Sequence, residues 1–224
     1  MTSRVTGQVS PEEFKHFMSS LCQRNGLTLS EEKLELFYKY LEELLRWNRV
    51  HNLTGLDYWK DIVTRHFCDS LTPVKFFEDI GYNPSGKRLV DVGSGAGFPG
   101  VPLKIYYGNA LDVHLVENVS KKCSFLTFLK RKLGLHYTVH CTDAQNLKEK
   151  FEIAITRALE VKGKKIDPLN YADRLLTRLA TELAVILKGK EVDPQKVQQL
   201  GYKIYELTLP DFKGLKILYK FLTQ

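Results

Sequence analysis

The sequence predicts an α/β fold in which a mostly parallel sheet is covered by helices on both faces and preceded by a helical extension. Strand-length apolar runs alternate with helical patterns after residue 86, whereas only helical patterns precede it. Crossover helices that join parallel strands produce such alternation. The turn-forming run Asn83-Pro84-Ser85-Gly86 marks the boundary, so we expect a helical cap over residues 1–85 and an α/β domain over residues 86–224.

The expected cap contains three helices. Ser10 can accept a hydrogen bond from the first helical turn, Pro11 suits that turn, and Asn25-Gly26 is a typical stop signal. Apolar side chains then recur at helical spacing in two further stretches. The three helices are expected from Ser10 to Asn25, from Ser30 through Leu45, and over Tyr58–Leu71.

The expected α/β domain begins with a buried strand and ends with two strands that follow the last helix. Ser120 is a candidate helix cap, and Gly134 is the expected stop of the same helix. Two further helices are expected at Tyr171–Thr181 and from Asp193 to Gly201. The expected strands are Leu89–Val92, Val113–Val116, Tyr137–Cys141, Ile153–Thr156, Leu183–Leu187, and a terminal pair at Tyr202–Leu207 and Leu215–Phe221.

The positive charge is confined to the second part of the chain. Residues 1–88 carry 12 Lys and Arg against 12 Asp and Glu, whereas residues 89–224 carry 21 against 14, which places the whole net charge of +7 there. Such an excess favours a polyanionic partner, and a merely solubilising surface is the alternative.

Composition and cysteine spacing exclude several classes of protein. With 43% hydrophobic and 26% charged residues, the chain is typical of a globular protein. Neither a bilayer-spanning run nor a secretory signal is recognisable, so we expect no membrane association and a cytoplasmic location. The four cysteines lack the close spacing of a metal or redox pair, so we expect small core residues and no metal.

A glycine-rich loop follows the first expected strand and predicts a nucleoside pocket. Ligands of parallel sheets bind beyond the carboxyl ends of the strands, where glycines let the backbone approach closely. Glu117 ends the second strand, where a carboxylate can accept hydrogen bonds from both ribose hydroxyls. Asp91, two residues before the first glycine, is expected to reach a cationic amine. The other candidate contacts are Gly93, Ser94, Gly95 and Gly97 in the loop, and Asp143, Ala144 and Gln145 after the third strand.

The loop alone fits two classes of enzyme. Gly95–Gly100 also matches the G-x-G-x-x-G pattern of dinucleotide-binding oxidoreductases, with Glu117 at a suitable distance. Phe98 and Pro99 would crowd the helix N-terminus where a pyrophosphate sits, which favours S-adenosylmethionine over NAD(P). A third interpretation of the sequence is a ribosome-binding module without catalytic turnover.

The chain resembles the RsmG family of ribosomal RNA methyltransferases, also called glucose-inhibited division protein B, in segments that keep the family's order over roughly residues 40–190. Individually these segments are short, but together they are specific. They are Trp47–Thr54 (WNRVHNLT), Arg65–Leu71 (RHFCDSL), Asp91–Leu103 (DVGSGAGFPGVPL), Thr156–Ala158 (TRA) and Leu187–Lys190 (LKGK).

The resemblance implies a class I methyltransferase fold with a seven-stranded sheet, and methyl transfer from S-adenosylmethionine to N7 of a guanine in the decoding-region loop of 16S rRNA. The partner is then 16S rRNA or the 30S subunit, and we expect a monomer. Carried over by motif, Gly93, Phe98, Ala144, Gln145 and Arg157 contact the cofactor. Residues 160–182 depart from the family pattern, where Thr177–Glu182 replaces a usual Gly-Gly turn.

The chemistry needs no catalytic base, because guanine N7 carries a free lone pair. We therefore expect positioning by Arg157, and RNA contacts by Arg157, Lys188 and Lys190. Phe98 is a candidate to stack on the target base or to pack within the protein. His66 and Asp69 share a helix face, and we expect them to fasten that helix, with closure of the pocket as the alternative.

Overall fold

The computed structural model describes residues 9–157, 167–189 and 191–222. Its centre is a seven-stranded sheet with the order β3-β2-β1-β4-β5-β7-β6. Strands β1 to β5 pair in parallel, whereas β7 is antiparallel to both of its neighbours, which confirms the predicted sheet and terminal pair. The strands are β1 (Lys87–Val92), β2 (Leu111–Glu117), β3 (Thr138–Cys141), β4 (Phe151–Arg157), β5 (Ala180–Lys188), β6 (Lys203–Glu206) and β7 (Lys216–Phe221).

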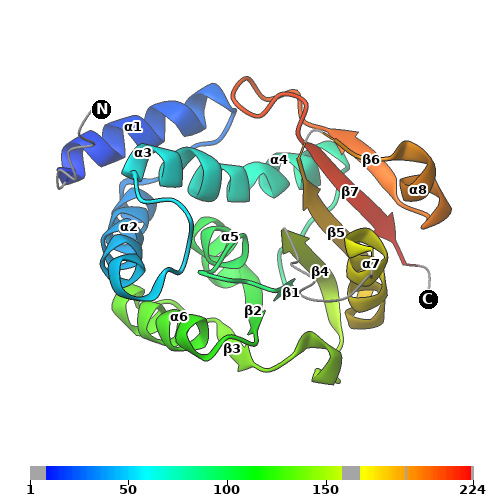
Figure 1. Ribbon diagram of the computed structural model, residues 1–224. Helices are drawn as coiled ribbons and strands as arrows, with labels where there is room; N and C mark the ends of the chain where they lie inside the picture. Colours follow the sequence, from blue (N-terminus) through cyan, green and yellow to red (C-terminus); the bar gives the residue numbers. More distant parts are fainter. Residues whose placement is uncertain (1–8, 158–166, 190, 223–224) are drawn as a thin grey trace, which may run out of the picture.

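The central strands are buried on both faces, which explains why they read as continuous apolar runs. Alternate residues point to opposite faces, so Leu89 belongs to one buried cluster and Val90 to the other. Figure 1 shows helices α7 and α8 on one face of the sheet and α5 and α6, with the N-terminal helices, on the other. These helices are α5 (Gly100–Tyr107), α6 (Ser120–Leu133), α7 (Pro168–Leu179) and α8 (Pro194–Gln199).

The first two N-terminal helices, α1 (Pro11–Arg24) and α2 (Glu31–His51), begin as predicted. Ser10 Oγ accepts a hydrogen bond from Glu13 N at 3.1 Å, and Ser30 caps the second helix in the same way. A single cluster of buried side chains runs from these helices into the sheet. The helical extension is thus a further layer packed on one side of the sheet (Figure 1).

The third N-terminal helix differs from the prediction in its length and regularity. We expected one helix ending at Leu71, but the helical path continues to Asp79 with changes of hydrogen-bonding pattern. Pro73 has no N–H to donate to the Asp69 carbonyl oxygen, which instead accepts from Thr72 Oγ1 at 2.7 Å. The path consists of α3 (Trp59–Ile62), a π-helical segment η1 (Val63–Cys68), a 3₁₀ turn η2 (Asp69–Leu71) and α4 (Thr72–Asp79).

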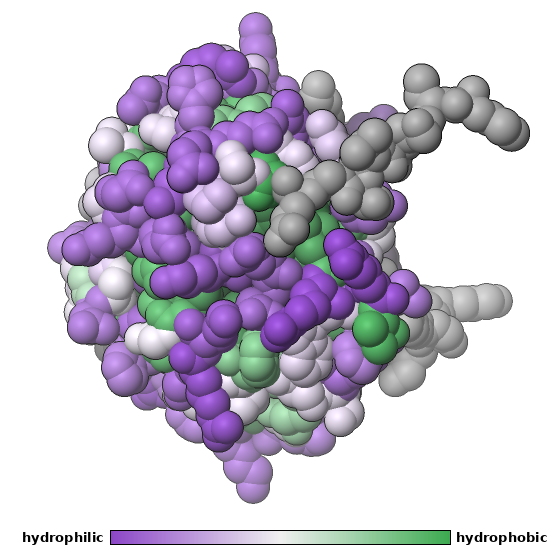
Figure 2. Space-filling model, turned by 90° about the vertical axis from the view of Figure 1, so that its left-hand side faces the viewer, coloured by the Kyte–Doolittle hydropathy of each residue, from purple (hydrophilic) through white to green (hydrophobic). Residues whose placement is uncertain are grey.

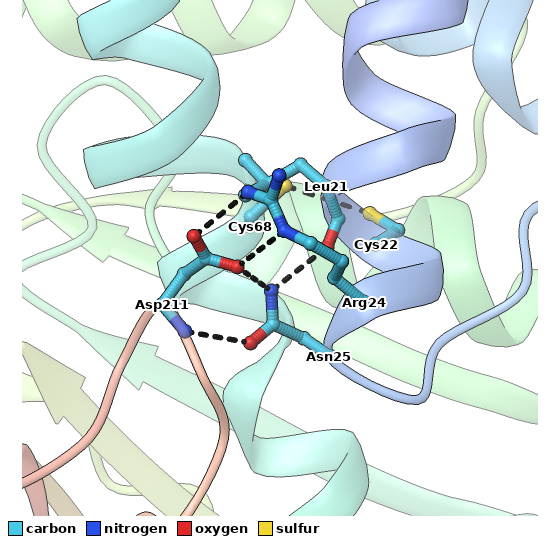
Figure 3. A network of polar contacts seen from close by, with 6 residues as sticks. All are labelled: Leu21, Cys22, Arg24, Asn25, Cys68 and Asp211. Carbon is cyan, nitrogen blue, oxygen red and sulfur yellow. Dashed lines mark hydrogen bonds and ion pairs between the residues drawn. The ribbon is translucent and has the colours of Figure 1, made fainter.

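A polar network fastens the end of α1 to the segment between β6 and β7 (Figure 3). Asp211 accepts two hydrogen bonds from the Arg24 guanidinium, at 2.8 and 3.2 Å. Asn25 donates to the same carboxylate at 2.7 Å and accepts from Asp211 N at 3.1 Å. The network thus ties the N-terminal layer to the last two strands of the chain, β6 and β7, which are far from it in the sequence.

The cysteines fall into two pairs; three of them are buried as expected, and Cys141 is the exception. Cys123 on α6 and Cys141 at the end of β3 form a disulfide, and the Cys141 residue is exposed. Cys22 and Cys68 are buried thiols whose sulfur atoms lie 3.5 Å apart. Sequence spacing did not reveal the first pair because the packing of α6 on the sheet creates it.

Gly97 allows α2 to approach the glycine loop, and Gly97→Ala is expected to destabilise the fold. Its φ is +107°, and an added Cβ would lie 2.7 Å from Tyr40 Oη and 2.8 Å from Val101 Cγ2. Strain and overlap together should lower the free energy of unfolding by about 3 kcal/mol. Urea denaturation measures the loss.

Gly81→Ala is the matched control for that substitution. Gly81 also has a positive φ, of +68°, but an added Cβ would meet nothing within 4 Å. In Gly81→Ala only the left-handed backbone conformation should then lower the free energy of unfolding, by about 1 kcal/mol. Equal losses for the two variants would contradict the packing role of Gly97.

Candidate functional site

A cavity of about 460 Å³ lies at the carboxyl ends of β1, β2, β3 and β4. The loop after β1 forms one wall, the ends of β2 and β3 a second, and the N-terminal layer closes the side next to β4. Its volume is in the range of small-molecule sites. Its lining includes Leu53, Thr54, His66, Gly93, Ser94, Gly95, Ala96, Phe98, Glu117, Asn118, Val119, Lys122, Thr142, Asp143, Ala144, Gln145, Arg157, Tyr171 and Leu175.

The glycine loop is held in place by its own backbone. The N–H groups of Gly93 and Ser94 donate to the Val116 carbonyl oxygen at 2.9 and 3.0 Å, which ties the loop to β2. Gly95 has a φ of +60°, and a Cβ added there would meet no atom within 4 Å. The loop therefore presents bare backbone and open space to the cavity, as a closely approaching ligand requires.

Glu117 joins the loop to the start of α6. One carboxylate oxygen accepts from Gly95 N at 2.8 Å, and the other accepts from Asn118 N and Val119 N at 2.9 and 2.8 Å. A carboxylate has about four acceptor positions, so one remains for a ligand's hydroxyl group. Ser120, predicted as the cap of α6, is the first residue of that helix, and no side chain of the described residues caps it; Val119 stands at the cap position.

Asp91 does not line the cavity, which corrects the expectation that it reaches the cofactor directly. It is fully buried below the loop, and its Oδ2 accepts from Gly100 N at 2.9 Å, at the start of α5. Its Oδ1 has no hydrogen-bond partner among the described residues. The carboxylate thus occupies the helix N-terminus where a dinucleotide's pyrophosphate would bind.

Burial raises the pKa of Asp91 to about 7, which predicts a pH dependence of stability. In the unfolded chain this pKa is about 3.9. At a pH between these two pKa values, Asp91 holds a proton in the folded state that it releases in the unfolded state. The contribution of Asp91 to the free energy of unfolding therefore falls as the pH rises through this range. Relative to the parent, Asp91→Asn should therefore gain about 2 kcal/mol in unfolding free energy between pH 5 and pH 8. Urea denaturation at both pH values measures it, and a pH-independent difference would contradict the shift.

The Phe98 ring packs inside the protein, which is the second of the two roles considered for it and not a stack on an RNA base. Only 5% of the residue is exposed. Tyr40 stacks on it at 5.5 Å and His66 at 4.6 Å between ring centroids, and the Arg157 guanidinium lies 5.3 Å from its centroid. Its surroundings leave no face for a base. Gly97 likewise faces α2 and not the cavity.

Arg157, at the end of β4, connects the sheet to the N-terminal layer. Its Nη1 donates to Asp69 Oδ2 at 3.0 Å and to the Arg65 carbonyl oxygen at 3.1 Å. Its Nη2 lies 3.1 Å from His66 Nδ1. His66 and Asp69 thus fasten their segment through Arg157, as expected, and His66 also lines the cavity. The π-helical segment that carries His66 is of a kind frequent at functional sites.

The two partners of Arg157 have shifted pKa values. Burial, with a further contribution from the Arg157 charge, lowers the pKa of His66 to about 4, so the imidazole is neutral at physiological pH. Burial raises the pKa of the Asp69 carboxyl, and the Arg157 charge opposes this shift. The Arg157 charge therefore favours the ionised form of Asp69 against the effect of burial.

The residues after β3 lie on the opposite side of the cavity, as predicted. Asp143 Oδ1 accepts from Gln145 N at 2.8 Å and caps the short 3₁₀ turn η4 (Ala144–Asn146). Gln145 Nε2 donates to the Tyr171 hydroxyl at 3.0 Å. Tyr171 thus brings the start of α7 to the same wall.

Sequence comparison places the chain among known proteins. A family model described as rRNA small subunit methyltransferase G matches residues 33–202. The ribosomal RNA small subunit methyltransferase G of Aquifex aeolicus is 44% identical over 200 residues, which cover 89% of this chain and 97% of that protein. The chain belongs to this family. Its counterpart from Oenococcus oeni is 39% identical over 67% of this chain and 62% of its own length.

Solved structures show that this family member has the fold of S-adenosylmethionine-dependent methyltransferases. Magnesium protoporphyrin IX methyltransferase of Synechocystis has a TM-score of 0.56 at 16% identity, covering 88% of this chain and 99% of that chain. A 16S rRNA methyltransferase of Thermus thermophilus has a TM-score of 0.53 at 16% identity, covering 69% of this chain and 43% of that chain. Family and fold together decide against the oxidoreductase reading.

Of the predicted RNA contacts, Lys188 lies outside the cavity and Lys190 lies outside the residues that the structure describes. Lys188 is partly exposed at the end of β5 and does not line the cavity. Lys190 and residues 160–166 fall outside the described residues, so the expectations for them stay predictions.

Several lining residues were not among the predicted contacts. Thr54, Asn118 and Tyr171 line the cavity without having been assigned a role there. Thr54 belongs to the Trp47–Thr54 motif, and the polar residues of that motif could have indicated a place in the site. Asn48 in that motif holds the turn that follows α2, because its side chain accepts from Thr54 N at 2.8 Å and donates to the Leu56 carbonyl oxygen at 3.1 Å.

Proposed function

We propose that this protein transfers the methyl group of S-adenosylmethionine to N7 of a guanine in the decoding-region loop of 16S rRNA. One observation carries the proposal: every residue that lines the cavity falls within residues 33–202, the part that matches the rRNA small subunit methyltransferase G family. The cavity therefore lies in the part of the chain that matches the family, and we assign methyl transfer to it.

The cavity suits the cofactor in chemistry as well as in volume. The Glu117 carboxylate retains one acceptor position for a ribose hydroxyl, on the oxygen that accepts only from Gly95 N, and the open backbone at Gly95 admits close approach. Asp143, Ala144 and Gln145 offer polar groups for the adenine at the far wall. We assign Gly93, Ser94, Gly95, Glu117 and this far wall to cofactor binding, whereas Asp91, Gly97 and Phe98 support the loop from behind.

The chain's own residues need to position the base and exclude water. When bound, S-adenosylmethionine supplies a methyl group already activated by its sulfonium. Guanine N7 has a free lone pair, so no side chain has to remove a proton. Leu53 and Leu175 supply apolar walls, and Arg157 holds the N-terminal layer against the end of β4.

The RNA has to present the guanine outside a duplex, because N7 faces the narrow major groove of A-form RNA. Basic side chains able to contact phosphates lie on α2 and α6, and Lys122 of α6 also lines the cavity. Figure 2 shows that mostly hydrophilic residues cover the face formed by α1, α2 and α6. The exposed basic residues there include Arg46, Arg49, Lys121, Arg131 and Lys132. Lys188 and Lys190 remain proposed contacts.

Methyl transfer with nucleoside mapping tests the proposal. Purified protein, labelled S-adenosylmethionine and ribosomal RNA from a strain lacking the protein should yield one 7-methylguanosine in 16S rRNA. Naked 16S rRNA and assembled small subunits should be compared, since either can be the substrate. Gly95→Arg serves as the blocked-cavity control. RNA binding without any transfer would favour the non-catalytic module instead.

No helix within residues 9–157, 167–189 or 191–222 is long and apolar enough to cross a bilayer. We propose that the protein acts in the cytoplasm as a monomer, in keeping with a ribosomal RNA substrate. Light scattering of the purified chain tests the oligomeric state, and a stable dimer would contradict it.

A further inference from the structure

Three polar side chains form a hydrogen-bonded chain along the cavity wall next to β4. Arg157 Nη2 lies 3.1 Å from His66 Nδ1, and His66 Nε2 lies 2.6 Å from Thr54 Oγ1. All three residues line the cavity. The directions of these hydrogen bonds decide what the last member, Thr54, can offer to a ligand.

The guanidinium fixes the tautomer of His66. His66 Nδ1 has two neighbours, Arg157 Nη2 and the Arg65 carbonyl oxygen, both at 3.1 Å. A proton on Nδ1 would point toward one of the guanidinium hydrogens, which cannot be removed. The Arg65 carbonyl oxygen accepts from Arg157 Nη1 and has a second acceptor position, so the guanidinium and not this oxygen decides the tautomer. Nδ1 is therefore the acceptor, and the neutral ring carries its proton on Nε2.

This tautomer makes the Thr54 hydroxyl a donor only. A hydroxyl has two acceptor positions and one proton. Thr54 Oγ1 accepts from His66 Nε2–H and, at 3.3 Å, from Leu56 N. Both acceptor positions are thus filled, and among the residues that the structure describes no acceptor takes the hydroxyl proton. Asn48 holds the Thr54 backbone, so the hydroxyl is fixed at the cavity wall.

A hydroxyl group that can donate a hydrogen bond but not accept one distinguishes guanine from adenine at the base edge that carries N7. Guanine presents the acceptors O6 and N7 there, whereas adenine presents N7 beside the N6 amino donor. N7 has to stay free for the methyl carbon, which leaves O6 as the group to recognise. An adenine amino group at this place would face a hydroxyl with no acceptor position left.

We propose that the Thr54 hydroxyl donates a hydrogen bond to O6 of the target guanine and thereby selects guanine over adenine. The inference rests on the proposed function, because it names how the same cavity chooses its base. His66 and Arg157 act as positioning residues that keep the hydroxyl a donor. Thr54 itself touches the substrate.

The decisive test measures kcat/KM for two bases and two proteins. The substrates are small subunits reconstituted from 16S rRNA with guanine or 2-aminopurine at the mapped position; 2-aminopurine keeps N7 but lacks O6. Thr54→Val should lower kcat/KM on guanine on the order of 100-fold. The same substitution should change kcat/KM on 2-aminopurine little, because that base has no O6 to lose. Equal losses on the two bases would overturn the proposal.

Controls separate recognition from folding and from cofactor binding. Thr54→Ser keeps the hydroxyl and should restore most of the activity on guanine. Thr138→Val, at an exposed threonine that begins β3 at the opposite end of the sheet from the cavity, should leave activity unchanged. Binding of S-adenosylhomocysteine, measured by calorimetry, should be the same in Thr54→Val as in the parent. If the parent protein does not methylate guanine N7 in 16S rRNA, the proposed function is wrong. If the parent methylates it and Thr54→Val does so equally well, only the role of Thr54 is wrong.

The tautomer is tested without any activity measurement. Nitrogen-15 NMR of the imidazole side chains should show His66 with a bare Nδ1 and a protonated Nε2 at neutral pH. Arg157→Ala should abolish this preference, because it removes the donor to Nδ1. A protonated Nδ1 in the parent would overturn the proposal, since the Thr54 hydroxyl would then donate to Nε2 and not to a base.

Discussion

Glu117→Ala should weaken S-adenosylmethionine binding by at least about 100-fold. Two effects add: the ribose loses its acceptor, at about 1.5–3 kcal/mol for each hydrogen bond to a charged group, and three backbone N–H groups lose theirs. Gly95 N is one of them, so the loop itself loosens. Isothermal titration calorimetry with S-adenosylmethionine measures the change in Kd, and each factor of ten corresponds to about 1.4 kcal/mol.

Two variants show whether the loss belongs to this carboxylate. Glu117→Gln keeps one oxygen acceptor and the side-chain size, so it should fall between the parent and the alanine variant. Glu149→Ala removes an exposed carboxylate that pairs with Arg88 at 3.0 Å away from the cavity, and Kd should not change. A Glu117→Ala variant that binds the cofactor like the parent would remove Glu117 from the binding site.

Arg157→Ala should lower methyl transfer at least tenfold while the fold persists. The substitution removes the donor to Asp69, to the Arg65 carbonyl oxygen and to His66, so the N-terminal layer loses its connection to β4. Loss of a partly buried ion pair should also lower the unfolding free energy by about 2 kcal/mol. Initial rates with ribosomal RNA and urea denaturation measure the two effects, and near-normal turnover would contradict a role in the site.

Arg88→Ala is the matched control for that loss. Arg88 also pairs with a carboxylate and lies over an aromatic ring, that of Phe151, at 4.7 Å. It sits at the start of β1, at the opposite end of the sheet from the cavity. The substitution should cost some stability but leave methyl transfer unchanged. A similar fall in turnover for both variants would indicate a general loss of stability.

Much of the fold could be predicted because local patterns decide it. Helix stops at Asn25-Gly26 and Gly134 and the apolar runs of the central strands reflect short-range chemistry, and the structure confirms them. The end of the third N-terminal helix escaped prediction. There the hydrogen-bonding pattern changes between Val63 and Leu71, which depends on packing against the rest of the molecule.

The cavity walls were predicted where they follow strand ends, and missed where tertiary packing creates them. Glu117 and Asp143–Gln145 lie where strand order and the glycine loop indicated. Phe98 could not be assigned, because Tyr40 and His66 enclose its ring from distant parts of the chain. Asp91 could have been placed, since strand alternation puts its side chain on the Leu89 face, toward α5.

A crystal structure of the protein with S-adenosylhomocysteine tests the central claim most directly. We expect the ribose hydroxyls to lie within hydrogen-bonding distance of the Glu117 carboxylate, with the adenine beside Ala144 and Gln145. The sulfur should point toward the wall formed by Thr54, His66 and Arg157. A ligand bound elsewhere, or bound in this cavity with its ribose away from Glu117, would contradict the account.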